Sequence, residues 1–237
     1  MARAELKFPT LPFEYEIVRS KRKSLAIHVR SGKVTIQSPL KASILWISEF
    51  VSENIPWIQG KIKDQKTKAK ELLVIADNHD VPYMGRPRRL QVVPAKQQKV
   101  ELKDDRLLLH VPPRNRDNLE KLFSNWLLEQ AREYMATHTI KVAKLLGLDH
   151  KLKDVVFRKT RSKWGHCEDT GVIQYNWLVM MAPRAVIDYL IVHETCHLRH
   201  LDHSPRFWKA VGVLCPDYKV HREWLNLNGH KLWTSPR

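Results

Sequence analysis

The sequence predicts an α+β protein with a β-rich N-terminal region that also carries helices, residues 1–113, and a helical C-terminal domain, residues 114–237. Before residue 113, short runs alternate apolar and polar residues, which is the pattern of half-buried strands. After it, apolar residues recur at intervals of three and four, which is the pattern of an amphipathic helix. Pro112-Pro113 lies between the two patterns and extends neither, so we expect the domain boundary there.

In the N-terminal region, a β-hairpin is expected over residues 25–36, because apolar residues alternate with polar ones on both sides of Ser31-Gly32. Ser43 is a suitable N-cap for a helix whose apolar pattern continues past Pro56 to a basic end at residues 61–70. Further strands are expected over residues 88–93, 99–102 and 106–111.

In the C-terminal domain, the spacing of apolar residues from Leu119 onwards predicts a long amphipathic helix that ends near Gly147, a natural C-cap. A strand over residues 154–158 and a return strand over 171–180 are expected next. The segment from Pro183 to Leu201 is apolar nearly all the way round and predicts a buried helix. Two more helices are expected over residues 205–214 and 220–227.

The buried helix carries the most informative motif of the chain, His193-Glu194-Thr195-Cys196-His197. Histidines four residues apart share one face of a helix, about 6 Å apart along its axis, and can bind one zinc ion. Burying these imidazoles and a carboxylate is costly unless a partner such as a metal compensates. Glu194 follows the first histidine and is therefore the candidate general base for a zinc-bound water.

A third ligand is expected shortly after this helix. Ser204-Pro205 is a good start for a new helix, so the chain turns there and His203 can fold back to the metal. His200 and Asp202 are the alternative third ligands. Three protein ligands leave one position for water, which is the catalytic pattern, and zinc lowers the pKa of that water to about 7.

Composition adds a second observation, a net charge of +16 and a pI near 9.9. Such a charge favours anionic partners, including nucleic acid and nucleotides. Three cysteines, an odd number without close pairing, fit a reducing cytoplasm better than a disulfide framework. Without an 18-residue apolar run or a signal-peptide pattern, we expect a cytoplasmic protein with no membrane partner.

Several segments together resemble the YgjP-like metallopeptidase family. Residues 161–167, RSKWGHC, are similar to its R-x-x-W-G-S-C element, and residues 182–197 to its A-P-x-x-V-I-D-Y-V-V-x-H-E-x-x-H segment. Residues 202–208, DHSPRFW, are similar to its N-H-S-P-x-F-W element. The resemblance implies a zincin-like catalytic domain behind a β-rich N-terminal part. It also implies zinc ligands at His193, His197 and His203, with Glu194 as the base.

Residues 175–178, YNWL, are similar to the family's L-N-W-R-L strand, and with the first element they give four candidate substrate-binding residues: Arg161, Trp164, His166 and Asn176. Two positions depart from the family pattern. His166 stands where the family has Ser, so it is either a donor to the transition state or a loop residue. Asp202 stands where the family has Asn, a change that we expect to leave the metal site unaltered.

The resemblance leaves three functions open. Peptide hydrolysis by zinc-bound water is the default expectation. Related proteins carry the label UTP pyrophosphatase, and that reaction would use cations such as Arg158 and Lys163 with a magnesium-bound nucleotide. The absence of a P-loop motif counts against a nucleotide enzyme. A nucleic-acid-associated protease is the second alternative, because of the charge of +16.

Overall fold

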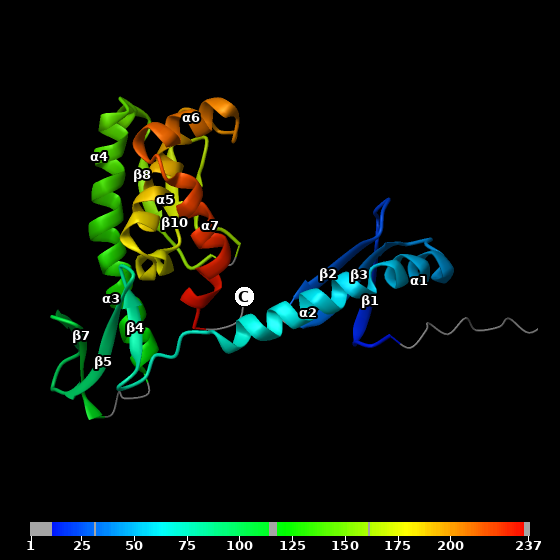
Figure 1. Ribbon diagram of the computed structural model, residues 1–237, viewed down its shortest axis with the longest axis horizontal. Coiled ribbons are helices and arrows are strands. Elements are labelled where there is room, and N and C mark those ends of the chain that lie inside the picture. The colour runs from blue at the N-terminus through cyan, green and yellow to red at the C-terminus, as the bar shows by residue number, and fades with distance from the viewer. Residues whose placement is uncertain (1–10, 31, 114–117, 161, 235–237) are drawn as a thin grey trace, which may run out of the picture. The chain divides into compact units, whose positions relative to one another are not determined.

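The computed structural model describes residues 11–30, 32–113, 118–160 and 162–234. It divides into two compact units, one of residues 1–72 with 235–237 and one of residues 73–234, hereafter the N-terminal and C-terminal units. Both units combine helices with small sheets (Figure 1), so the α+β prediction is confirmed.

The N-terminal unit contains a three-stranded sheet and two helices. Its strands are β1 (Tyr15–Ser20), β2 (Ala26–Arg30) and β3 (Lys33–Pro39), in the order β1-β3-β2, and its helices are α1 (Ile44–Glu53) and α2 (Ile55–Lys70). The antiparallel pair β2–β3 is the predicted hairpin, with Gly32 at φ +77° in its turn, whereas Ser31 lies outside the described residues. A core that includes Ile36, Ile47 and Ile58 joins the sheet to both helices.

The first sheet of the C-terminal unit has four strands. They are β4 (Asp80–Tyr83), β5 (Arg86–Pro94), β6 (Lys99–Lys103) and β7 (Arg106–Val111), in the order β4-β5-β7-β6. Three of them match predicted strands. The expected boundary at Pro112-Pro113 differs from the division at Leu72, because β6 and β7 pack against the next helix, α3 (Leu119–Ala131). Leu107 and Leu109 of this sheet are fully buried, so the strands belong to the core of the C-terminal unit.

The second sheet of this unit lies next to the metal-site helix. It contains β8 (Asp154–Phe157), β9 (Gly165–Cys167) and β10 (Val172–Tyr175), in the order β8-β10-β9. Among the described strands, β9 therefore pairs with β10 alone and lies at the edge of the sheet. The expected return strand over 171–180 ends earlier, because the chain after Asn176 turns into the 3-10 helix η4 (Trp177–Met181).

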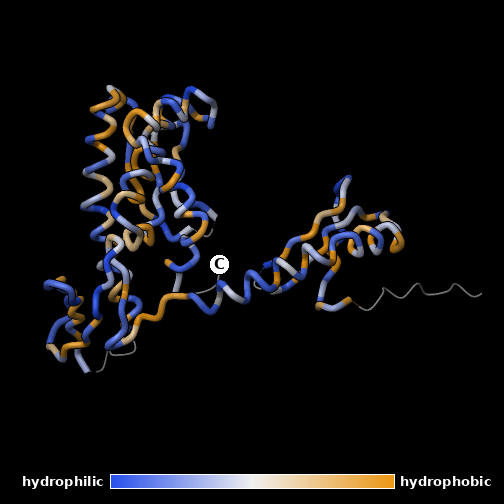
Figure 2. Tube along the Cα trace, viewed as in Figure 1, coloured by the Kyte–Doolittle hydropathy of each residue, from blue (hydrophilic) through white to orange (hydrophobic). Residues whose placement is uncertain are grey.

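The remaining elements of the C-terminal unit are helical. The π-helix η2 (Arg132–Ala136) connects α3 to α4 (Thr137–Leu145), and two short 3-10 helices are η3 (Asp149–Lys151) and η5 (Gly229–Leu232). The helix α5 (Arg184–Cys196) contacts α4 on one side and α6 (Pro205–Leu214) and α7 (Tyr218–Asn228) on the other (Figure 1). Much of α5 is hydrophobic (Figure 2), as expected of a buried helix.

The buried helix ends earlier than the sequence predicts. The α-helix stops at Cys196, and residues 197–199 form a turn instead of continuing to Leu201. In the part of the chain that the structure describes, no helix has the length and apolar character needed to cross a membrane.

Candidate metal centre

Three imidazoles meet at the C-terminal end of α5. His193 lies in its last turn, His197 is its C-cap residue, and His203 lies just before α6. One ring nitrogen from each residue can be chosen so that all three lie within 4.8 Å of one another. The Nε2 atoms of His193 and His203 are 3.1 Å apart. Zinc–nitrogen bonds of about 2.0–2.1 Å in a tetrahedron would separate two ligand nitrogens by about 3.3 Å, so the spacing fits one shared ion.

The end of the helix at Cys196 is what permits this arrangement. The Nδ1 atom of His197 lies 2.8 Å from the carbonyl oxygen of His200, which is three residues further along the chain. A donated hydrogen bond from Nδ1 leaves Nε2 free to face a metal, which is the usual orientation of a zinc-binding imidazole. His200 therefore contributes its backbone to the centre, and its ring is outside the three-histidine cluster of the described residues.

The two alternative third ligands have other contacts. The Oδ1 atom of Asp202 accepts a hydrogen bond from the backbone N–H of Ser204 at 3.2 Å, which fixes the start of α6. Hydrogen bonds from the hydroxyl and then from the backbone N–H of Ser204 lower the pKa of the Asp202 carboxyl. Among the described residues, the geometry thus favours His203 over His200 and Asp202 as the third ligand.

Tyr189 orients the first histidine, although the sequence analysis did not identify it. It lies one turn before His193 on α5, and its hydroxyl oxygen is 3.4 Å from His193 Nδ1. The spacing of four residues was the available sequence signal, since such pairs are neighbours on a helix. The hydroxyl is the expected acceptor for the Nδ1 proton of a metal-bound His193.

Aromatic rings surround the three histidines. Phe207 of α6 stacks on His197 with ring centroids 4.3 Å apart and meets His193 edge-on at 4.9 Å. Trp208 packs against His193 and His203 at 5.6 and 5.5 Å. Because these rings exclude water, burial lowers the pKa of His193 to about 3, with the neighbouring histidines as the next cause. Burial also lowers the pKa of His197. Both imidazoles are therefore neutral and able to bind a metal at neutral pH.

Glu194 is buried, with only 4% of its surface exposed, and packs against the backbone of β9. A Cβ atom added to Gly165 would lie 2.3 Å from Glu194 Oε1, so the carboxyl group occupies the space that a side chain at 165 would need. Burial raises the pKa of Glu194 to about 8, and the charge of Lys163 opposes this rise. A carboxyl group with a raised pKa is a good proton acceptor near neutral pH.

The predicted substrate-binding residues differ in their surroundings. His166 on β9 is exposed, and its charge contributes to the lowered pKa of His197, so it lies near the centre. Trp164 packs against Trp233 and against the backbone of Gly229. Arg161 lies outside the described residues.

Asn176 is buried, and both ends of its side-chain amide make hydrogen bonds within the protein. Its Nδ2 donates to the carbonyl oxygen of Thr160 at 2.9 Å, and its Oδ1 accepts from the N–H of Leu178 at 3.1 Å. The side chain therefore braces the loop between β8 and β9 against the start of η4. A direct contact of Asn176 with substrate stays a prediction.

The chain was compared with known proteins. The family model described as the YgjP-like metallopeptidase domain matches residues 23–228, and the chain belongs to this family. Among solved structures, the crystal structure of the metallopeptidase zymogen of Pyrococcus abyssi abylysin is similar at 22% identity and a TM-score of 0.36. That match covers 40% of this chain and 95% of the other, and we draw no conclusion from it. A search of curated proteins finds no match.

Proposed function

We propose that this member of the YgjP-like family is a zinc-dependent metallopeptidase, with His193, His197 and His203 as ligands and Glu194 as the general base. The convergence of three imidazoles beside a buried glutamate carries the proposal. When bound, zinc would lower the pKa of a water and polarise the scissile carbonyl group. Three nitrogen ligands without a cysteine suit a catalytic zinc site with one open position.

Glu194 supplies the proton-transfer group of the proposed reaction. Its carboxylate would accept the proton of the attacking water and then deliver it to the leaving amine. The carboxyl group lies against the backbone of Gly165, so β9 limits the positions that the base can take. The raised pKa makes both steps feasible near neutral pH.

The edge strand β9 provides a surface on which a peptide can be aligned. One edge of β9 pairs with β10, and no other described strand pairs with its second edge. An extended peptide can add to such an edge through main-chain hydrogen bonds. Because β9 packs against α5, a peptide on this edge would pass close to Glu194.

A nucleoside triphosphate pyrophosphatase is the second candidate, and the exposed cations before β9 favour it. Arg158, Lys159 and Lys163 are exposed, and Lys163 is close enough to Glu194 to influence its pKa. Such groups suit a polyanion with bound Mg²⁺. A nucleic-acid-associated protease rests on the net charge of +16 alone, and its binding would weaken steeply with salt.

The experiment that tests these candidates measures two reactions of the zinc-loaded protein: cleavage of a peptide library and pyrophosphate release from a nucleoside triphosphate panel. We expect peptide cleavage that disappears in Glu194→Gln while the zinc content stays unchanged. Glu168→Gln is the matched control, because Glu168 is an exposed carboxylate that directly follows β9. Pyrophosphate release without peptide cleavage would establish the second candidate, and turnover by Glu194→Gln would exclude this mechanism for either.

A further inference from the structure

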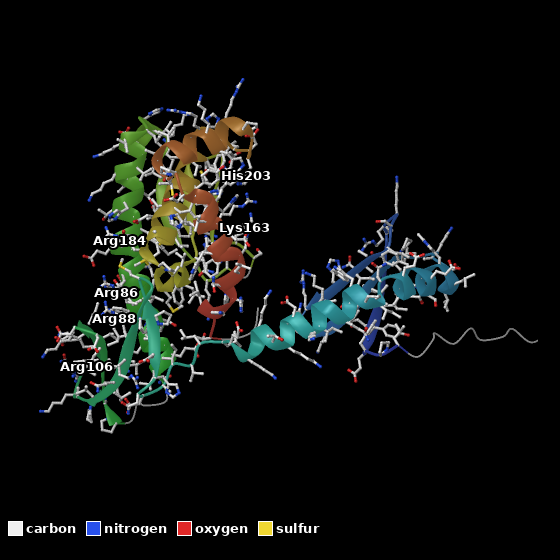
Figure 3. All side chains as sticks on the ribbon, viewed as in Figure 1. Arg86, Arg88, Arg106, Lys163, Arg184 and His203 are labelled. Carbon is white, nitrogen blue, oxygen red and sulfur yellow. The ribbon has the colours of Figure 1, made fainter. Side chains whose placement is uncertain are left out.

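The metal centre is bordered by cationic side chains from two sides. Lys163 lies two residues before Gly165, whose backbone contacts the Glu194 carboxyl group. The Lys163 side chain is exposed and lies on the same side of the C-terminal unit as His203 (Figure 3). Lys163 therefore stands beside the general base.

The second cation, Arg222 of α7, lies on the His193 side of the centre. Its guanidinium carbon is 5.0 Å from the ring centroid of Trp208, the tryptophan that packs against His193 and His203. Trp208 also stacks on Tyr218, one turn before Arg222, with centroids 5.1 Å apart and an interplanar angle of 16°. The guanidinium of Arg222 therefore lies over Trp208, next to the three histidines.

Neither cation has a carboxylate partner among the described residues, whose ion pairs all involve other lysines, arginines or histidines. Of the two acidic residues adjacent in sequence to these histidines, Glu194 is buried and Asp202 accepts a hydrogen bond from Ser204. Exposed cations from the loop before β9 and from α7 therefore lie near the three histidines. An unpaired exposed cation is best satisfied by an anionic group of a ligand.

We propose that the metal centre is selective for acidic peptides, with Lys163 and Arg222 each receiving a substrate carboxylate on its own side of the scissile bond. This inference rests on the proposed peptidase function. The two residues come from different elements, the loop before β9 and the helix α7, so they contact different positions of an extended substrate. Peptides with lysine or arginine at these positions would meet a like charge and bind poorly.

The first test compares kcat/KM for peptides that differ only by Glu or Gln at one position near the scissile bond. We expect a preference for Glu of about tenfold in kcat/KM at each of two positions. This ratio corresponds to about 1.4 kcal/mol, the order of magnitude of one charge-assisted contact. Lys163→Gln should abolish the preference at one position and Arg222→Gln at the other. Lys141→Gln is the control, because Lys141 is an exposed cation on α4, across α5 from α7 (Figure 1). An equal preference in all variants would refute the proposal.

A binding measurement separates this proposal from the peptidase proposal. Isothermal calorimetry on the zinc-loaded protein would compare two hydroxamates, one with a carboxylate side chain and one with the corresponding amide. We expect tighter binding of the carboxylate compound, with the difference reduced in Lys163→Gln or Arg222→Gln and retained in Lys141→Gln. If this holds but no peptide is cleaved, the cationic entrance stands and the peptidase function fails. Equal binding of the two compounds, no binding of either to protein of measured zinc content, or a preference for nucleoside triphosphate over both would overturn the selectivity for acidic peptides.

Discussion

Burial of Glu194 predicts that replacing this residue stabilises the metal-free protein at alkaline pH. The carboxyl group has a pKa of about 8 in the folded protein, against an ordinary value of 4.5. Between these values the folded state binds more protons than the unfolded state, so the free energy of unfolding falls as pH rises. Glutamine has the same shape and does not ionise, so Glu194→Gln removes this pH-dependent loss.

The magnitude follows from the linkage between proton binding and folding. From the two pKa values, ionisation of Glu194 costs about 1 kcal/mol at pH 5 and about 4 kcal/mol at pH 8. The stability of the wild-type protein relative to Glu194→Gln should therefore fall by about 3.5 kcal/mol between these pH values. Other groups titrate alike in both proteins and cancel in the comparison.

Urea unfolding of both proteins at pH 5 and pH 8, after removal of metal with a chelator, measures this difference. The control repeats the urea unfolding with zinc bound. A bound cation lowers the pKa of a nearby carboxyl group, so the stability difference between the two proteins should then depend less on pH. A difference in stability that stays constant between pH 5 and pH 8 in the metal-free proteins would refute the reasoning. It would mean that water reaches the carboxyl group in the folded state.

Three further predictions concern single contacts. Gly165→Ala should lower peptidase activity by at least about tenfold, because the added Cβ would overlap the Glu194 carboxyl group. Gly60→Ala is the control, since a Cβ at Gly60 meets open space. Measurements of kcat and of zinc content test this prediction. Tyr189→Phe removes the hydroxyl near His193 Nδ1 and should weaken zinc binding by about tenfold. Competition with a chelating dye measures the affinity, and an unchanged affinity would contradict this role of Tyr189. Ile58→Ala should cost about 2–5 kcal/mol in the N-terminal unit, measured by urea unfolding, because the side chain is fully buried, and it should leave the zinc content unchanged.

Most of the candidate site can be predicted from the sequence, because its residues lie in short local motifs. His193, Glu194 and His197 share one helix, and the spacing of side chains on a helix is fixed by its geometry. Ser204-Pro205 marks the start of α6, and His203 directly precedes it. The same local rules predicted the hairpin β2–β3 and the strands β5 to β7.

Other features depend on contacts between segments far apart in the sequence. The division at Leu72 depends on β6 and β7 packing against α3, and a change of periodicity at Pro112-Pro113 does not reveal such packing. Likewise, the edge position of β9 depends on which strands pair, which the alternation of residues leaves open.

The sequence by itself determined the family and predicted the three histidines and the glutamate of the candidate site, because helix spacing and short motifs are local properties of the chain. Only the tertiary structure decided what surrounds them. Glu194 contacts Gly165, and Arg222 lies over Trp208, through packing between separate elements. Burial, and with it the raised pKa of Glu194, arises only when α5 is enclosed by β9, α4, α6 and α7, because desolvation depends on all the neighbours of a group at once.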